Sequence, residues 1–557
     1  MMQGRAASAV QILQRARDLH SNDPRILADL GAAYTLRGDI EHRYGDYLSA
    51  VDCLGQSLHL RAHVPDVVFN LALALERAQL KDQAVEQWNE YLKLDRAGGW
   101  AEEARQHLAD LKKTLQSRDD ALRRITNDPA RFLALVAGGS TIDAEAYLRD
   151  AAVSKWLPLA TASGPAREAI TRLARILEER HGDAWLEDLV KAGMEAQLAP
   201  AFHQLGAARS MNLNGQDMQP ALASAREAAK TLLDAGNRPA SLWARFEQVS
   251  SLHALFRHDE CLAAADSLMR DLDAHPYVWL RAQLRIEMGI CLLRIAQLTD
   301  ASARLREASE MAHRAGFGGT ELRASVQYMD CTGHTGLPSE SFSSAQDSLR
   351  VFWNGIHHPL AFQQLVDRLR VMTTDTGQKD AAFFLAGSDV WAAKQTMDPS
   401  VEGPARANLA AAAQAVGEEA EAHLNLKLAD QLLAGAPYGY RLEPELSLAR
   451  VELERGGADA ALARLNSLGP DFPSALVATE YYGLLGRADL QKGLVAPAID
   501  AFRKSIETGG LRVASVAAER ERAGVLRAIE PSYRGLTEAV LSSDGPAAAL
   551  RQWQSFR

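Results

Sequence analysis

The sequence predicts an all-α solenoid, an array of helix pairs repeating roughly every 34 to 40 residues. Three observations lead to this prediction. Small and large apolar residues recur at fixed offsets along most of the chain, and no stretch alternates apolar and polar residues over the length of a strand. Alanine, the best helix former, is abundant, whereas aromatic residues make up only 6%. An array of this kind can extend over 557 residues without one thick core.

The clearest repeat extends from Pro65 to Gly98. It predicts a helix over 67–79, a short turn and a second helix over 83–94. Small and large side chains fall on the facing sides of this pair, where the two helices cross. They stand at the positions of a tetratricopeptide repeat, and they are Leu71, Ala72, Leu75, Ala84, Trp88 and Tyr91.

A preceding repeat uses similar positions. Leu30, Gly31 and Tyr34 lie in its first helix, and Ala50 and Leu54 lie in its second. The spacing between the two sets is longer than in the clearest repeat. We therefore expect residues 40–48 to form an insertion that separates the two helices.

The C-terminal part of the chain repeats with a longer period. A triplet with offsets of four and seven residues returns about every 40 residues, slips near Ala420 and recovers at Ala461. Because alanine is common, the shared register carries the prediction rather than any single triplet. Helix ends are expected between triplets, at Gly236-Asn237-Arg238-Pro239, at His275-Pro276 and at Gly316. The first residues of the triplets are Ala221, Cys261, Ala301, Ser341, Ala381, Ala461, Ala498 and Ala549.

Residues 117–198 are helical in pattern but lack the repeat register. Their large apolar side chains favour burial, which argues against a flexible linker. We expect a helical connector that packs the short array onto the long one. These side chains are Trp156, Leu157, Ile176, Trp185 and Leu189. The predicted domains are 1–116, an N-terminal array; 117–198, the connector; and 199–557, a C-terminal array.

Charge and cysteine content exclude several classes of protein. Lys plus Arg total 61 against 71 Asp plus Glu, and no basic stripe or polybasic cluster marks a nucleic-acid or anionic-membrane surface. No run of about 18 apolar residues predicts a membrane span, and Met1–Val10 has no apolar core for a secretory signal. We expect a cytoplasmic protein whose cysteines are buried and unpaired. The cysteines are Cys53, Cys261, Cys291 and Cys331.

Catalytic and metal-binding patterns are weak. A cysteine peptidase needs a thiolate and an imidazole in contact, but His181 and Cys331 lie in helix–turn contexts. Gly182 after His181 is typical of a helix C-cap. Cys331-x-x-His334 is half of a metal site, and no phosphate-binding loop of the Walker type occurs. We expect no enzyme, no cofactor and no metal site, and retain an enzyme around His181 and Asp183 only as a minor alternative.

The remaining candidate site is a surface. In tetratricopeptide arrays the first helices line a concave groove that suits peptide or domain recognition. Asn70 stands where such grooves often bond the backbone of a ligand, although it is also a common filler there. In the last predicted helix, Trp553 and Phe556 form a candidate docking end. The predicted groove residues are Asp66, Phe69, Asn70, Leu73, Glu76 and Arg77.

Several segments resemble the repeat region that precedes CHAT domains, the caspase-like cysteine peptidase domains of bacteria. They include DPRILADLGAAYTLRGD, FNLALALERAQLKDQAVEQWNEYLKLD, LARILEERHGDAWLEDL and PSYRGLTEAVLSSDGPAAALRQWQSFR. The resemblance implies a right-handed superhelix in a bacterial scaffold or sensor. Such a scaffold would recognise a protein partner and position or regulate a caspase-like protease, in defence or in regulated proteolysis.

In that family a peptidase domain with a histidine and a cysteine nucleophile would follow, whereas this sequence stops at Arg557. We expect the peptidase to be missing or separately encoded, so that any partner is a protein or peptide. The alternative is a stand-alone adaptor that assembles a protein complex with no protease involved.

Overall fold

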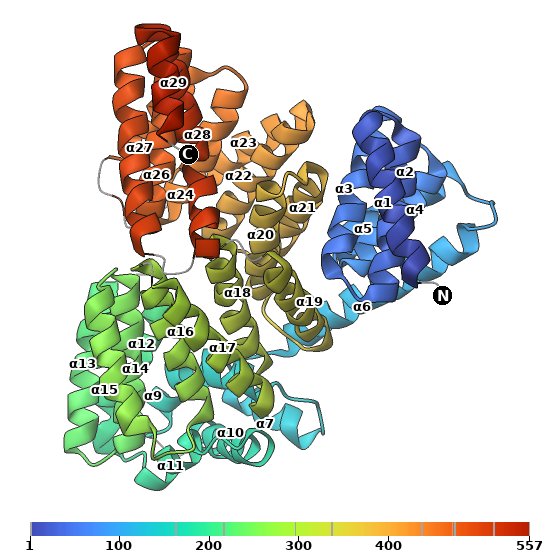
Figure 1. Ribbon diagram of the computed structural model, residues 1–557. Helices are drawn as coiled ribbons and strands as arrows, with labels where there is room; N and C mark the ends of the chain where they lie inside the picture. The colour runs from blue at the N-terminus through green and yellow to red at the C-terminus, as the bar shows by residue number, and fades with distance from the viewer. Residues whose placement is uncertain are drawn as a thin grey trace. The chain divides into compact units, whose positions relative to one another are not determined.

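The computed structural model describes residues 3–161, 164–214, 218–295, 297–335, 338–435, 438–469, 472, 475–515 and 519–555. Within these ranges all regular secondary structure is helical, which confirms the predicted all-α class (Figure 1). Consecutive helices pair along the chain, so the protein is an all-helical repeat protein of the tetratricopeptide-like type.

The chain forms two compact units. Unit 1 comprises Met1–Ser117, Thr332–Leu349 and His358–Arg557, and unit 2 comprises Arg118–Cys331 and Arg350–His357. Three helices, α6, α18 and α19, contribute residues to both units.

The first helices of unit 1 are α1 (Gln3–Leu19), α2 (Pro24–Glu41), α3 (Tyr44–Leu60), α4 (Pro65–Arg77), α5 (Lys81–Leu94) and α6 (Ala101–Arg124). Its later helices are α19 (Pro338–Asn354), α20 (Pro359–Asp375), α21 (Lys379–Thr396), α22 (Pro399–Val416), α23 (Glu419–Leu433), α24 (Tyr438–Glu454), α25 (Ala458–Ser467), α26 (Ala475–Gln491), α27 (Val495–Ser515), α28 (Glu519–Asp544) and α29 (Pro546–Gln554).

Unit 2 begins with helices outside the repeat register: α7 (Pro129–Ala137), α8 (Ala144–Tyr147), the π-helix η1 (Leu148–Trp156), α9 (Leu157–Leu159), α10 (Pro165–His181), α11 (Trp185–Ala192) and the short 3₁₀ helix η2 (Ala196–Leu198). Its repeat helices are α12 (Ala199–Asn214), α13 (Met218–Asp234), α14 (Arg238–Ala254), α15 (His258–Leu272), α16 (Val278–Arg294), α17 (Leu298–Ala315) and α18 (Gly318–Thr335), most of which lies in unit 2.

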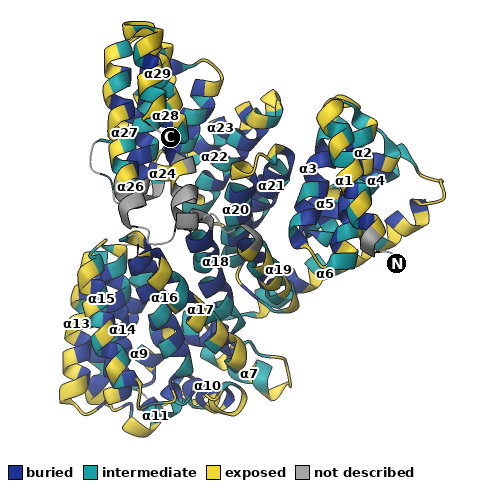
Figure 2. Ribbon diagram, in the orientation of Figure 1, coloured by how far each residue is buried: buried dark blue, intermediate teal, exposed yellow. Residues whose placement is uncertain are grey.

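Buried residues lie where paired helices pack against each other (Figure 2), and the predicted repeat residues belong to this core. The six residues of the clearest repeat are buried between α4 and α5. The first residue of every C-terminal triplet is also buried, in the second helix of its pair. Small residues lie where the axes approach: a Cβ added at Gly31 would lie 2.5 Å from Leu54 Cγ. The helix ends expected near Asn237 and Gly316 are confirmed by an Asn237 N-cap and a left-handed Gly316 C-cap.

Residues 40–48 do not form the predicted insertion. The helix α2 continues to Glu41 and α3 begins at Tyr44, with His42 in the left-handed conformation at the turn. The additional residues lengthen both helices instead. Their length is supported by packing, because Tyr44 and Tyr47 are buried and the ring of Tyr47 fits against Gly38.

The connector helices pack within unit 2, and their five large apolar residues are all buried as predicted. The sequence pattern did not indicate the wide turns of η1. Pro158, in the first turn of α9, supplies no backbone N–H, so the carbonyl oxygen of Ser154 cannot accept the usual α-helical hydrogen bond from residue 158. The carbonyl oxygens of Val153 and Ser154 lie against Gly206 of α12, where a Cβ would come within 3.2 Å of each. Gly206 therefore permits a close approach of α12.

The cysteines differ in part from the prediction. All four are buried, but Cys261 on α15 and Cys291 on α16 form a disulfide, while Cys53 and Cys331 are free. The pair was missed because 30 residues separate the two cysteines and no pattern in the sequence marks them. Packing of the second helix of one pair against the first helix of the next brings them together.

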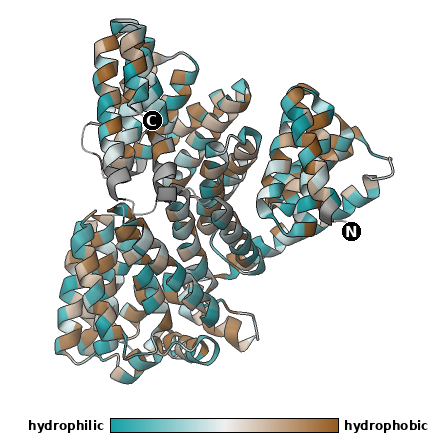
Figure 3. Cartoon of the chain, viewed as in Figure 1, coloured by the Kyte–Doolittle hydropathy of each residue, from teal (hydrophilic) through white to brown (hydrophobic). Residues whose placement is uncertain are grey.

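Hydrophobic and hydrophilic residues alternate around most helices of both units (Figure 3). Among the described residues, no helix is both long enough and apolar enough to span a bilayer.

Candidate functional site

The helix α4 carries the six predicted groove residues. Pro65 begins this helix with a backbone angle suited to the first turn, and Asp66 places a negative charge near its positive end. One side of α4 is buried by Val67, Val68 and Leu71. The six predicted residues lie on the rest of its circumference: Asp66 is exposed, and Phe69, Asn70, Leu73, Glu76 and Arg77 are half-buried.

Phe69 belongs to an aromatic cluster. Its ring centroid lies 4.9 Å from that of Trp88, 5.2 Å from Tyr91 and 5.6 Å from Trp100. Trp88 and Tyr91 are buried, whereas Trp100 remains 58% exposed. Trp100 was not singled out from the sequence, because it lies in the turn before α6 and outside the repeat positions. A large exposed indole beside Phe69 is a feature typical of protein-binding surfaces.

Glu76 and Arg77 join the neighbouring first helices. One oxygen of Glu76 accepts a hydrogen bond from Trp88 Nε1 at 3.3 Å and lies 2.9 Å from His107 Nδ1 on α6. The His107 ring stacks on Trp88 at 5.0 Å. Arg77 Nε donates to Asp39 Oδ1 on α2 at 3.0 Å. These contacts fix α2, α4 and α6 beside one another.

We name this surface the α2–α4–α6 face. It consists of Asp39, Asp66, Phe69, Asn70, Leu73, Glu76, Arg77, Trp100 and His107.

Unit 2 contains a row of charged residues that the sequence analysis did not identify. The row has one member on each of α12, α14, α16 and α18, at equivalent places in successive repeats. A search for charges at the repeat spacing would have found it. The members are Arg209, Glu247, Glu287 and Arg323.

The members of this row are paired with one another. Arg209 Nη1 lies 3.3 Å from Glu247 Oε1, which also accepts a hydrogen bond from Trp243 at 2.7 Å. Glu287 accepts from Arg323 at 2.8 Å and lies 2.7 Å from His253 Nδ1. Burial works against ionisation of Glu287, but Arg323 and His253 overcome it and hold its pKa below the usual range. The row is therefore largely satisfied inside unit 2 and stabilises the array.

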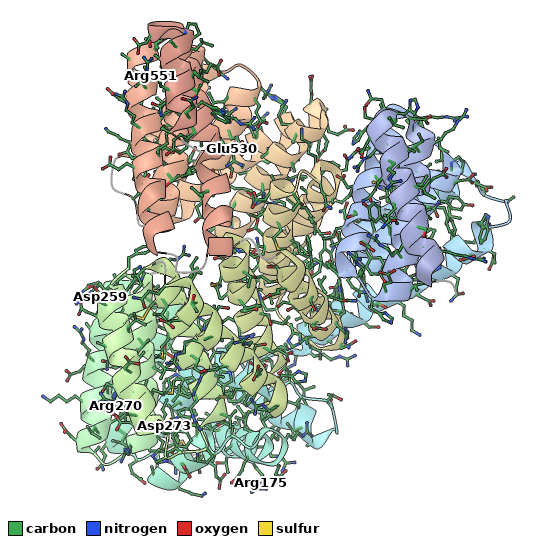
Figure 4. The ribbon with its side chains drawn as sticks, in the orientation of Figure 1. Arg175, Asp259, Arg270, Asp273, Glu530 and Arg551 are labelled. Carbon is green, nitrogen blue, oxygen red and sulfur yellow. A yellow bond between two sulfur atoms is a disulfide. The ribbon has the colours of Figure 1, made fainter. Side chains whose placement is uncertain are left out.

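Other charged residues of unit 2 lie at its outer surface, among them Arg175, Asp259 and Arg270 (Figure 4). They contrast with the buried row, because they remain in contact with solvent.

The connector caps the repeat helices of unit 2. Asp183 Oδ2 accepts a hydrogen bond from the backbone N–H of Trp279, at the start of α16, at 2.7 Å. Glu145 accepts from the N–H groups of Gly319 and Thr320, at the start of α18, at 2.7 and 2.6 Å. Neither α16 nor the first turn of α18 obtains these acceptors from its own sequence, so the connector supplies them. Burial raises the pKa of Asp183 to about 6 and raises that of Glu145.

The side chains of His181 and Asp183, the residues of the alternative enzyme site, both make structural contacts. His181 stacks on Phe317 at 4.7 Å, and its Nδ1 lies 2.8 Å from the carbonyl oxygen of Ala315. Gly182 forms the predicted left-handed C-cap of α10. Cys331 is buried, and its thiol donates to the carbonyl of Leu298 at 3.2 Å. In the part of the chain that the structure describes, no group of three His, Cys, Asp or Glu residues could hold a metal ion.

The candidate docking end is described in part. Trp553 is half-buried on α29, and Phe556 lies outside the described residues. Leu541 on α28 and Leu550 on α29 are exposed.

No family model matches the sequence, and no curated protein matches it either. Solved structures that are similar include the APC/C hetero-tetramer Cut9–Hcn1, with 15% identity over 95% of this chain and 94% of that one, at a TM-score of 0.40. The apo form of RapI has 15% identity over 62% of this chain and 99% of that one, at 0.41. Yeast Tom70 has 13% identity over 98% and 95%, at 0.28. Because the identities and TM-scores are this low, the function of the chain is inferred from its own residues.

Proposed function

We propose that the chain is a non-catalytic scaffold that binds a protein or peptide partner on the α2–α4–α6 face. The observation that carries this proposal is the combination of a fixed frame and accessible side chains. The ion pair of Arg77 with Asp39 and the contact of Glu76 with His107 join three first helices. Asp66 and Trp100 remain exposed on this frame. A surface that is ordered before binding loses little conformational freedom on association.

The chemistry of this face suits an extended segment with basic and apolar side chains. Asp66 supplies negative charge, and the rings of Phe69 and Trp100 supply apolar area. Aromatic side chains in such positions commonly dominate binding energy, and a basic side chain over an indole face gains a further cation–π attraction.

We further propose that the partner is connected with a caspase-like CHAT protease, which the scaffold positions or regulates. This step is supported by the sequence resemblance alone. The nucleotide sequence downstream of the Arg557 codon and in the neighbouring genes tests this proposal. A peptidase with a His/Cys pair should be encoded in the same reading frame or in a neighbouring one. Without such a peptidase, the protein would instead act as a stand-alone adaptor.

Binding is tested with the encoded peptidase and the full chain, measured by calorimetry. The variants Trp100→Ala and Asp66→Arg change exposed side chains of the face, and each should weaken binding about tenfold or more. The matched control is Phe256→Ala, which removes an aromatic ring that is 55% exposed on unit 2. Unchanged affinity in both face variants would show that the partner binds elsewhere, for example at the docking end that includes Trp553.

The division into 1–116, 117–198 and 199–557 and the cytoplasmic location remain predictions. The disulfide between Cys261 and Cys291 removes one argument for the cytoplasmic location, because disulfides are rare in the reducing cytosol.

A further inference from the structure

Unit 1 contains a contact between helices that are distant in the sequence. The N-terminal helices α3 and α5 pack against α21, about 300 residues later in the chain. The approach is close: a Cβ added at Gly55 of α3 would lie 2.7 Å from Asp380, and one added at Gly387 of α21 would lie 3.0 Å from Gln83. We name this contact the α3–α5–α21 contact.

The contact is lined by carboxyl groups. Asp52 Oδ1 accepts a hydrogen bond from the backbone N–H of Asp380 at 3.0 Å. The helix α21 begins at this point, and its N-cap residue Gln378 makes no side-chain cap. Asp52 therefore caps α21 from a different helix pair.

A second carboxyl group, that of Asp82 on α5, contacts α21 further along that helix. Both oxygens of Asp82 accept from the Ser388 hydroxyl, at 2.8 and 2.9 Å. His59 Nε2 lies 2.8 Å from Asp380 Oδ1, and its Nδ1 lies 3.5 Å from Glu418. Asp52, Asp82 and Asp380 are all at least nine-tenths buried. For Asp52 and Asp82, burial with few basic neighbours favours the neutral form of the carboxyl group.

We propose that this contact is a proton-dependent latch, which tightens as the medium becomes mildly acidic and loosens as it becomes alkaline. The latch would change the attachment of the helices that carry the α2–α4–α6 face, without taking part in partner binding itself. The proposal stands on the geometry of the contact and does not depend on the proposed function.

The charged groups around the latch determine its direction. Asp52 faces Asp380 and, more weakly, Arg17. Burial and the Asp380 charge raise the pKa of Asp52 to about 7, and burial raises the pKa of Asp82. On the same side, Glu86 faces Asp82, Glu421 and Lys394. The hydrogen bond to Asp380, followed by the charges of Asp380 and Glu418, raises the pKa of His59 against the effect of burial.

These shifts share one sign. A group whose pKa is higher in the closed contact holds its proton more tightly there. The contribution of such a group to the stability of the closed contact is complete below its ordinary pKa, and it is lost as the pH rises through the raised pKa. For Asp52 the window lies between 3.8 and about 7, and for His59 it begins at 6.5. When Asp52 carries a proton, rotation of the Gln56 amide, which now donates to Oδ2 at 2.7 Å, turns its oxygen toward that proton.

Hydrogen exchange at the start of α21 tests the latch. The amide of Asp380 is bonded to Asp52, so its protection reports the closed contact directly. After correction for intrinsic exchange, its protection should fall about tenfold between pH 6 and pH 8 from Asp52 alone. Amides in the middle of α26, in the same unit and outside the contact, serve as the internal reference.

The variant Asp52→Asn resembles the protonated acid and should keep this amide protected at pH 8, which removes the tenfold change. Ser388→Ala removes the hydrogen bonds to Asp82, which lower the pKa of Asp82, and should lower protection at every pH without flattening the slope. Glu102→Gln, an exposed change on α6, is the control. A pH-independent wild type, or the same slope in Asp52→Asn, would overturn the proposal. If Asp52→Asn does not fold, His59→Gln provides the second test, because it should reduce the slope above pH 6.5.

Discussion

Removal of the Asp183 carboxyl group tests whether the connector caps the repeat array. Asp183 is 1% exposed, and its carboxylate accepts from the backbone of Trp185 at 3.1 Å and of Trp279 at 2.7 Å. Asp183→Ala leaves both N–H groups buried without an acceptor, at about 1–3 kcal/mol each, and one of them belongs to the helix start that Asp183 caps. At pH 4, where the contribution of Asp183 is nearly complete, we expect a loss of about 2–6 kcal/mol in the free energy of unfolding of unit 2.

The variant Asp183→Asn separates the cap from the charge. Asparagine keeps an acceptor oxygen but cannot ionise. Because the pKa of Asp183 is raised to about 6, its contribution to stability is complete below 3.8 and is lost as the pH rises through 6. The lost amount is about 3 kcal/mol for a shift of roughly two units. At pH 7 the free energy of unfolding of Asp183→Asn should therefore approach or exceed that of the wild type. At pH 4 it should be lower than that of the wild type.

Urea unfolding followed by tryptophan fluorescence measures this difference. Trp185 contacts Trp243 at 4.1 Å, and Trp243 stacks on Trp279 at 4.8 Å, so the signal originates beside the substituted residue. The reasoning is refuted if Asp183→Ala unfolds within 1 kcal/mol of the wild type, or if Asp183→Asn is as damaging as Asp183→Ala.

Three further predictions concern the core. Leu71→Ala, at a position with no solvent exposure, should lower stability by about 2–5 kcal/mol in urea titrations, and a smaller loss than this range would mean that the site collapses around the cavity. Gly31→Val should lower it by about 1–3 kcal/mol, because the new side chain meets Leu54; unchanged stability would show that α2 and α3 can separate. Reduction of the Cys261–Cys291 disulfide, which closes a 30-residue segment, should lower it by about 3–4 kcal/mol, and non-reducing peptide mapping should detect the linked peptide.

The local features of the fold follow from the sequence because they depend on period and residue size. The buried faces of α4 and α5 could be predicted, since Ala84 and Trp88 stand at fixed offsets on one side of a helix. The same reasoning failed for residues 40–48, because periodicity does not distinguish a longer helix from a loop inserted between helices.

The caps and the α3–α5–α21 contact could not be predicted, because they join residues far apart in the chain. Asp183 and Trp279 are separated by 96 residues, and Asp52 and Asp380 by 328. Nothing in the sequence around an aspartate indicates which distant helix start it will face. Trp100 was missed for another reason, since it precedes a helix and belongs to no repeat position.

The caps have a consequence for how such a chain can change in evolution. Repeat arrays commonly gain and lose repeats, since each repeat contacts only its neighbours. Here Asp183 and Glu145 are matched to the starts of α16 and α18. Duplication or deletion of a helix pair between α14 and α18 would leave one carboxylate facing the wrong turn and one helix start uncapped. The connector therefore fixes the number of repeats in this part of the chain.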